Sequence, residues 1–116
     1  MMNKKDFSIV CIGAGNVATH LAQALQQKGF HLSQIYSRTQ ESAQALAQTL
    51  GCAWTTCLEQ VDEHADLYIV SVKDAVLETV ISQLVHCNPD ALYLHTAGSM
   101  PMEVWKEKFK NYGVAY

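Results

Sequence analysis

The 116-residue sequence lacks the features that mark several classes of protein. It has no run of basic residues and its formal net charge is -3, so nothing in it suggests a nucleic-acid or membrane-surface partner. No apolar run is long enough to cross a bilayer. Only 16% of the residues are charged and 49% are apolar, a balance that argues against disorder and fits one globular domain.

The sequence also lacks the cysteine and histidine patterns that are typical of redox and metal sites. The four cysteines, at positions 11, 52, 57 and 87, form no C-x-x-C pair, and the five histidines show no metal-ligand spacing. We therefore expect free thiols in a reducing cytosol, a cytoplasmic protein, and no metal site. The sequence contains no P-loop and no nucleophile elbow.

Strand and helix patterns alternate along the whole chain. We expect strands at residues 7–12, 31–37, 52–55, 66–72, 91–95 and 114–116, helices at residues 16–28, 40–50, 75–85 and 102–109, and a helical turn at 58–63. This alternation predicts an α/β fold, a doubly wound parallel sheet within a three-layer sandwich. Right-handed crossovers give the Rossmann strand order 3-2-1-4-5-6.

Two details of the helices are predicted as well. The first helix should bury Val17, Leu21 and Leu25 on one face, with two alanines beside them. Asp74 stands where the N-cap of the third helix is expected, because its side chain can accept a hydrogen bond from the first turn.

A G-x-G-x-x-A motif joins the first strand to the first helix. Gly13 allows a tight turn, Gly15 lets the backbone approach a phosphate, and Ala18 lets the helix pack close to the sheet. The N–H groups at the helix start then face the anion. An ordinary strand–helix connection is the alternative. We favour a dinucleotide site and assign to it Gly13, Ala14, Gly15, Asn16 and Val17.

The second strand ends without the acidic residue that usually accepts the ribose hydroxyls of NAD. Ser37, Arg38 and Thr39 stand there instead. A guanidinium can hold a phosphate through two hydrogen bonds, and hydroxyls add further ones, so these residues predict a 2′-phosphate site and NADP(H) as the cofactor. The missing acid also disfavours an FAD or S-adenosylmethionine site. The alternative is a solvated Arg38 before a helix capped by Thr39.

The fourth strand should end at the cofactor crevice, which would place Ser71, Val72 and Lys73 near the nicotinamide ribose. A solvated loop lysine is the alternative for Lys73.

The fifth strand leads into a loop that should open onto the same crevice. His95 there could be a general acid or a substrate ligand, because the pKa of histidine is ordinarily close to neutrality. The backbone N–H groups of Gly98 and Ser99 could bind a carboxylate or the nicotinamide amide. The alternative for His95 is a strand-end histidine bonded to the backbone.

Four segments, residues 13–18, 36–39, 70–74 and 95–99, together resemble the NADP-binding domain of one superfamily. Its members include pyrroline-5-carboxylate reductases, coenzyme-F420-dependent NADP oxidoreductases and 6-phosphogluconate/3-hydroxyisobutyrate dehydrogenases. The resemblance covers essentially the whole chain, and residues 95–99 are most similar to a bacterial branch in which a helical domain follows the Rossmann-like one. Residues 72–74 read Val-Lys-Asp where pyrroline-5-carboxylate reductases often have Val-Lys-Pro, which weakens assignment to that activity.

The resemblance implies roles for particular residues. Gly13, Gly15, Asn16 and Val17 would contact the pyrophosphate, residues 37–39 would contact the 2′-phosphate, and the backbone of residues 72–73 would lie near the nicotinamide. Similar proteins take their main catalytic lysine or acid, and their dimer contacts, from the helical domain. His95 and Lys73 are the catalytic candidates within this chain, and we expect residues 1–116 alone to be inactive.

Two functions follow from these predictions. The first is the cofactor domain of a longer NADP(H)-dependent oxidoreductase, homodimeric through a C-terminal helical domain, that transfers hydride to or from a small carbonyl or imine substrate. The second is a non-catalytic NADP(H)-binding sensor or interaction module, which the same fold could also support.

Overall fold

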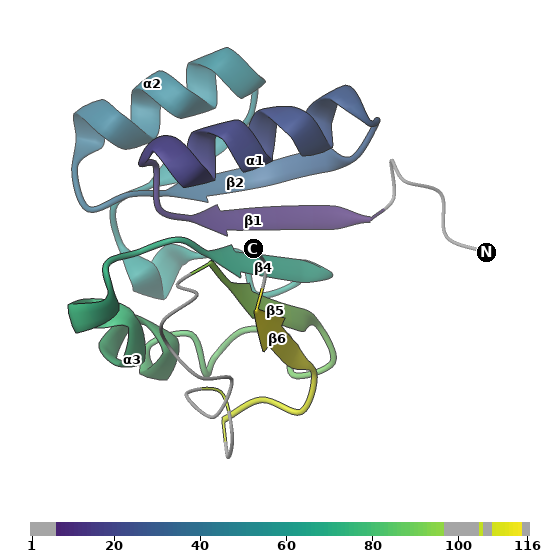
Figure 1. The fold of residues 1–116 in the computed structure, drawn as a ribbon, viewed down its shortest axis with the longest axis vertical. Coiled ribbons are helices and arrows are strands. Elements are labelled where there is room, and N and C mark those ends of the chain that lie inside the picture. The colour runs from purple at the N-terminus through teal and green to yellow at the C-terminus, as the bar shows by residue number, and fades with distance from the viewer. Residues whose placement is uncertain (1–6, 97–104, 106–107, 115–116) are drawn as a thin grey trace.

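A computed structural model describes residues 7–96, 105 and 108–114 of the chain. Its six strands pair in parallel to form one sheet in the order β3-β2-β1-β4-β5-β6 (Figure 1). The strands are β1 (Ser8–Ile12), β2 (His31–Tyr36), β3 (Ala53–Thr55), β4 (Leu67–Val70), β5 (Leu92–His95) and β6 (Tyr112–Val114). The predicted α/β class and the strand order 3-2-1-4-5-6 are therefore confirmed.

Helices cover both faces of this sheet (Figure 1). On one side lie α1 (Asn16–Gln27) and α2 (Gln40–Leu50), and on the other lies α3 (Asp74–Ser82). A short 3₁₀ turn, η2 (Leu58–Gln60), precedes β4. Within the described residues, no helix is both long and apolar enough to span a membrane. Because β1 pairs in parallel with both β2 and β4, the carboxyl ends of these three strands lie together at one edge of the sheet.

The third helix differs from the prediction at both ends. Lys73, with an extended backbone (φ -63°, ψ 145°), occupies the N-cap position, so Asp74 is the first helical residue rather than the cap. A carboxylate in the first turn is favourable there as well, because it faces the positive end of the helix dipole. The helix ends at Ser82, and Val85 is 61% exposed in the turns that follow.

The last predicted strand also differs from the structure in its bounds. The sixth strand begins at Tyr112, two residues before the predicted start. Most of the predicted helix at residues 102–109 lies outside the described residues.

The first helix faces the sheet through its small side chains. Ala18 and Ala22 are buried, whereas Val17 is 59% exposed and Leu21 and Leu25 are half-buried. The buried face of α1 therefore differs from the predicted one. The helix lies so close to the sheet that the methyl groups of its alanines fill the space between them. The leucines pack on its flank, against the core that also contains Ile35 and Leu46.

The core on the α3 side contains a cluster of aromatic rings. Tyr68 on β4 stacks on Tyr93 of β5 with ring centroids 4.8 Å apart, and Phe109 stacks on the same Tyr93 ring at 3.8 Å. Trp105 is fully buried beside them, whereas Trp54 on the edge strand β3 is 37% exposed. Stacked rings bury a large apolar area, so this cluster stabilises the β4–β6 half of the sheet.

Candidate functional site

The turn after β1 is tight and admits only glycine. Gly13 has φ 119°, a conformation that residues with side chains rarely adopt, and its N–H donates to the carbonyl oxygen of Tyr36 at 2.7 Å. A Cβ atom at Gly13 would lie 2.3 Å from the carbonyl oxygen of Ser71. The turn is therefore held against the ends of both β2 and β4.

Gly15 is the N-cap of α1 and faces open space. Its φ is -78°, and no heavy atom lies within 4 Å of the position where a Cβ would stand. No side chain caps the helix, and its first turn, which contains Asn16 and Val17, holds no acidic residue. The first N–H groups of a helix have no partner within it, so this end of α1 suits an anion such as a diphosphate.

A groove of about 430 Å³ opens over this turn. It is lined by Gly13, Gly15, Tyr36, Ser37, Arg38, Ser71, Val72, Lys73, Val76 and Val80. Two of these residues are cations and none is acidic, so the lining favours an anionic ligand. The tyrosine and the three valines add an apolar wall, which is typical of sites that bind a flat ring.

The predicted 2′-phosphate residues separate in the structure. Ser37 and Arg38 line the groove, with Ser37 nearly buried and its N–H donating to the carbonyl oxygen of Thr55 at 3.2 Å. Thr39 caps α2, because its Oγ1 accepts from the Ser42 N–H at 3.4 Å and donates to Ser42 Oγ at 2.9 Å. Thr39 borders a neighbouring hollow rather than the groove, so Arg38 is the residue of this trio best placed to meet a phosphate.

The residues that follow β4 also meet in the groove. The Ser71 N–H donates to the carbonyl oxygen of Ile12 at 2.8 Å, which extends the β1–β4 pairing by one residue. Val72 packs partly against the α3-side core, and Lys73 is exposed. The structure therefore brings Lys73 into the same groove as Arg38.

His95 is placed differently from the other predicted residues. Its side chain is completely buried, and its Nδ1 accepts a 2.9 Å hydrogen bond from the indole N–H of Trp105. It does not line the groove. This arrangement resembles the structural alternative, with the Trp105 indole as one partner of the imidazole. Gly98 and Ser99 lie outside the described residues.

Three groove residues were not predicted to be part of the site. Tyr36 is the last residue of β2, and Val76 and Val80 lie one turn apart on α3. The predicted strand order could have indicated these residues, because it brings the end of β2 and the start of α3 to the same edge of the sheet. The i, i+4 spacing of the valines then puts both on one helix face.

The cysteine thiols and the possible metal ligands of the chain are less suited to catalysis or metal binding. Burial raises the pKa of Cys11 to about 12, with the nearby Cys52 adding to the effect, and burial likewise raises the pKa of Cys87 to about 11. Thiols with such pKa values remain protonated at neutral pH and are poor nucleophiles. Within the described residues, no three histidine, cysteine or acidic side chains converge on a point that could hold a metal ion.

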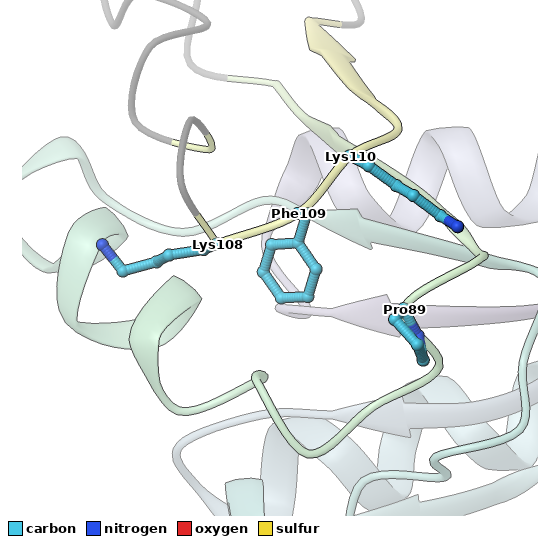
Figure 2. A pocket seen from close by; sticks show the side chains of 4 residues that line it. All are labelled: Pro89, Lys108, Phe109 and Lys110. Atoms are coloured by element: carbon cyan, nitrogen blue, oxygen red, sulfur yellow. The ribbon is translucent and has the colours of Figure 1, made fainter.

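A second hollow lies near the start of β6 (Figure 2). It is lined by Pro89, Lys108, Phe109 and Lys110. Figure 2 shows the two lysine side chains extending away from each other on either side of Phe109, and Lys110 forms a 2.5 Å ion pair with Asp90. The two ammonium groups therefore do not converge on a common anion, and the groove beside Gly13 is the better candidate.

Comparisons with known proteins show what this chain is similar to. The family model described as "NADP oxidoreductase coenzyme F420-dependent" matches residues 8–97. A protein of Bacteroides fragilis, assigned as an NADP oxidoreductase, is 50% identical over 95% of this chain and superposes with a TM-score of 0.92. A comparison with curated proteins gives no significant match.

More distant structures share the fold. A prephenate dehydrogenase of A. aeolicus, solved with hydroxyphenyl propionate and NAD+, is 17% identical over 97% of this chain with a TM-score of 0.81. An NADPH-dependent oxidoreductase assigned in Desulfitobacterium hafniense is 21% identical over 97% with a TM-score of 0.77. This chain spans 43%, 41% and 34% of the lengths of the Bacteroides, A. aeolicus and Desulfitobacterium proteins, respectively.

Proposed function

This chain belongs to the family of coenzyme F420-dependent NADP oxidoreductases, and from that premise we propose that its groove binds NADP(H) for hydride transfer. It is a nicotinamide-dinucleotide-dependent oxidoreductase domain with a Rossmann fold. The preference for NADP(H) over NAD(H) is the first part of the proposal. The second part is a small carbonyl or imine compound as the substrate.

The observation that carries the proposed preference is Arg38 in the groove. Arg38 lies just after β2, separated from its last residue by Ser37, in the region where NAD-binding domains usually carry an acid. It shares the groove with the Gly13 turn. A guanidinium attracts the 2′-phosphate that only NADP(H) carries, whereas a carboxylate would repel it. Lys73 adds a second positive charge to the same lining.

The groove also fits the rest of such a cofactor. The open space above Gly15 leaves room for a diphosphate next to the unpaired N–H groups of α1. Tyr36, Val72 and Val76 offer apolar surface to a flat base. When bound, the nicotinamide supplies the hydride chemistry, and the residues of this chain bind the cofactor, orient it and neutralise its charge.

The third part of the proposal concerns the source of the catalytic group. Because this chain spans less than half of the relatives described above, we propose that a helical domain elsewhere in the protein supplies the catalytic lysine or acid and the homodimer contacts. His95 is not positioned to reach the groove, so we assign it no catalytic step. Lys73 remains near enough to the groove to contact the cofactor.

Titration of the protein with NADPH and NADH tests the cofactor preference. We expect NADPH to bind at least about tenfold more tightly, since one charge-assisted hydrogen bond contributes about 1.5–3 kcal/mol. Equal affinities would contradict the preference. A panel of keto acids and cyclic imines, tested on protein that includes the proposed helical domain and followed by NADPH absorbance, then tests the reaction. NADPH binding without oxidation of NADPH by any compound would instead favour the non-catalytic sensor.

A further inference from the structure

The hydroxyl of Ser71 is buried without a hydrogen-bond partner. Among the described residues, Ser71 Oγ is the buried side-chain oxygen for which the structure gives no donor or acceptor. Other serine hydroxyls are bonded: Ser33 Oγ donates to the carbonyl oxygen of Ile9 at 3.3 Å, and Ser82 Oγ to that of Thr79 at 2.8 Å. Leaving a buried hydroxyl unpaired costs free energy, so an orphan of this kind requires an explanation.

The backbone around Ser71 is fixed by two contacts. Its N–H donates to the carbonyl oxygen of Ile12 at 2.8 Å, and its own carbonyl oxygen lies directly against the Gly13 turn, 2.3 Å from where a Cβ would stand. Because the backbone is held in place, the Ser71 hydroxyl gains a partner through rotation of its side chain or through a group that approaches it. The groove borders this residue, which makes the groove the direction in which a new partner can arrive.

From this we infer that Ser71 Oγ is a cofactor ligand that hydrogen-bonds an oxygen of the diphosphate–ribose chain of the bound dinucleotide. This inference rests on the proposed function, because it requires NADP(H) in the groove. A hydroxyl can donate to a phosphate oxygen or exchange hydrogen bonds with a ribose hydroxyl, and the dinucleotide offers several of both. An alanine at position 71 would satisfy the free protein better, so the hydroxyl serves binding rather than folding.

The substitution Ser71→Ala separates these two effects. We expect the midpoint of thermal unfolding of the free protein to stay the same or rise, because an unpaired hydroxyl is removed. The affinity for NADPH, measured by calorimetric titration, should fall about three- to tenfold, which corresponds to the loss of one hydrogen bond. The rise in the unfolding midpoint produced by a fixed NADPH concentration should shrink accordingly.

Ser82→Ala is the matched control. Ser82 ends α3, is exposed, and bonds only within its own helix, so this variant should keep the full NADPH affinity. If Ser71→Ala binds NADPH as tightly as the unchanged protein, a water molecule satisfies the hydroxyl and the inference is wrong. A clear drop in the stability of free Ser71→Ala would show a structural partner and would also overturn it. Failure of the unchanged protein to bind NADPH would instead refute the proposed function itself.

Discussion

The backbone N–H of Gly13 donates a 2.7 Å hydrogen bond to the carbonyl oxygen of Tyr36. This bond lies beyond the last residue of β1 and links the glycine turn to the residue that precedes Ser37 and Arg38. The part of the site proposed to hold the diphosphate and the part proposed to hold the 2′-phosphate are therefore joined through the main chain. Their spacing is fixed by the sheet rather than by flexible side chains.

Replacing Arg38 by alanine tests the proposed source of cofactor preference. We expect the NADPH affinity to fall about 10- to 100-fold, because a charge-assisted contact to the 2′-phosphate is lost. The affinity for NADH should change little, since NADH has no phosphate at that position. Titration of both cofactors under the same salt conditions measures the difference, and Lys108→Ala, an exposed cation outside the groove, is the control.

The two glycines of the turn should respond differently to alanine. Gly13→Ala combines a φ of 119° with a contact of 2.3 Å to the Ser71 carbonyl, so we expect a loss of at least about 2 kcal/mol in the free energy of unfolding. Gly15→Ala has an ordinary φ and open space, so its stability should change by less than about 1 kcal/mol. Urea denaturation measures both variants.

The same Gly15→Ala protein should nevertheless bind NADPH weakly. Its new methyl group projects into the space proposed for the diphosphate, so binding requires the cofactor or the turn to move. A stable Gly15→Ala protein that retains full NADPH affinity would contradict the location assigned to the diphosphate.

Tyr68→Phe tests a hydrogen-bond network under the aromatic core. Tyr68 Oη donates to the carbonyl oxygen of Asp62 and accepts from the N–H of Ala65 at 3.2 Å. Phenylalanine keeps the stacking on Tyr93 but leaves both backbone groups without this partner, so we expect a cost of about 1–3 kcal/mol in the free energy of unfolding. Tyr93→Phe, which removes one bond to the Asn88 carbonyl, should cost less.

The stability of the protein should fall between about pH 9 and pH 11. Burial raises the pKa of Cys11 to about 12 and that of Cys87 to about 11, from an ordinary value of 9.0. Above that value the unfolded chain loses these protons while the folded chain keeps them, so rising pH favours unfolding. The slope is at most about 1.4 kcal/mol per pH unit for each thiol.

Urea denaturation under reducing conditions at about pH 8, 9 and 10 measures this slope. Below the ordinary thiol pKa the contribution is fully present and the stability should not depend on these groups. Cys87→Ala should remove part of this loss, and Cys11 and Cys52, whose pKa values burial also raises, should account for the rest. A slope that is identical in Cys87→Ala and the unchanged protein would assign the pH dependence to other groups.

Helix boundaries were predictable where local capping decides them. The bounds of α2 match the prediction because Thr39 caps its start and Gly51, with φ 71°, ends it. The sequence does not decide the start of α3, since an aspartate is favourable both as N-cap and in the first turn. The register of α1 was predicted wrongly at Val17, because helical spacing alone does not report how closely the helix approaches the sheet.

The residues of the candidate site were likewise predictable only where local sequence features decide their position. The glycine turn and Arg38 could be located because a strand–turn–helix order and a strand end are local features of the sequence. The burial of His95 could not be foreseen, because its partner Trp105 reaches it only through tertiary packing. The unpaired hydroxyl of Ser71 was equally hidden, since the lack of a partner is a property of the folded neighbourhood.

The two tryptophans lie in different halves of the sheet, Trp54 on the edge strand β3 and Trp105 against Tyr93 of β5. One indole is 37% exposed and the other is fully enclosed, so their fluorescence should differ in emission wavelength. Each half of the sheet thus carries an intrinsic optical reporter. Substituting phenylalanine for one tryptophan at a time would show whether the half of the sheet that contains β3 and the half that contains β5 unfold together or in sequence.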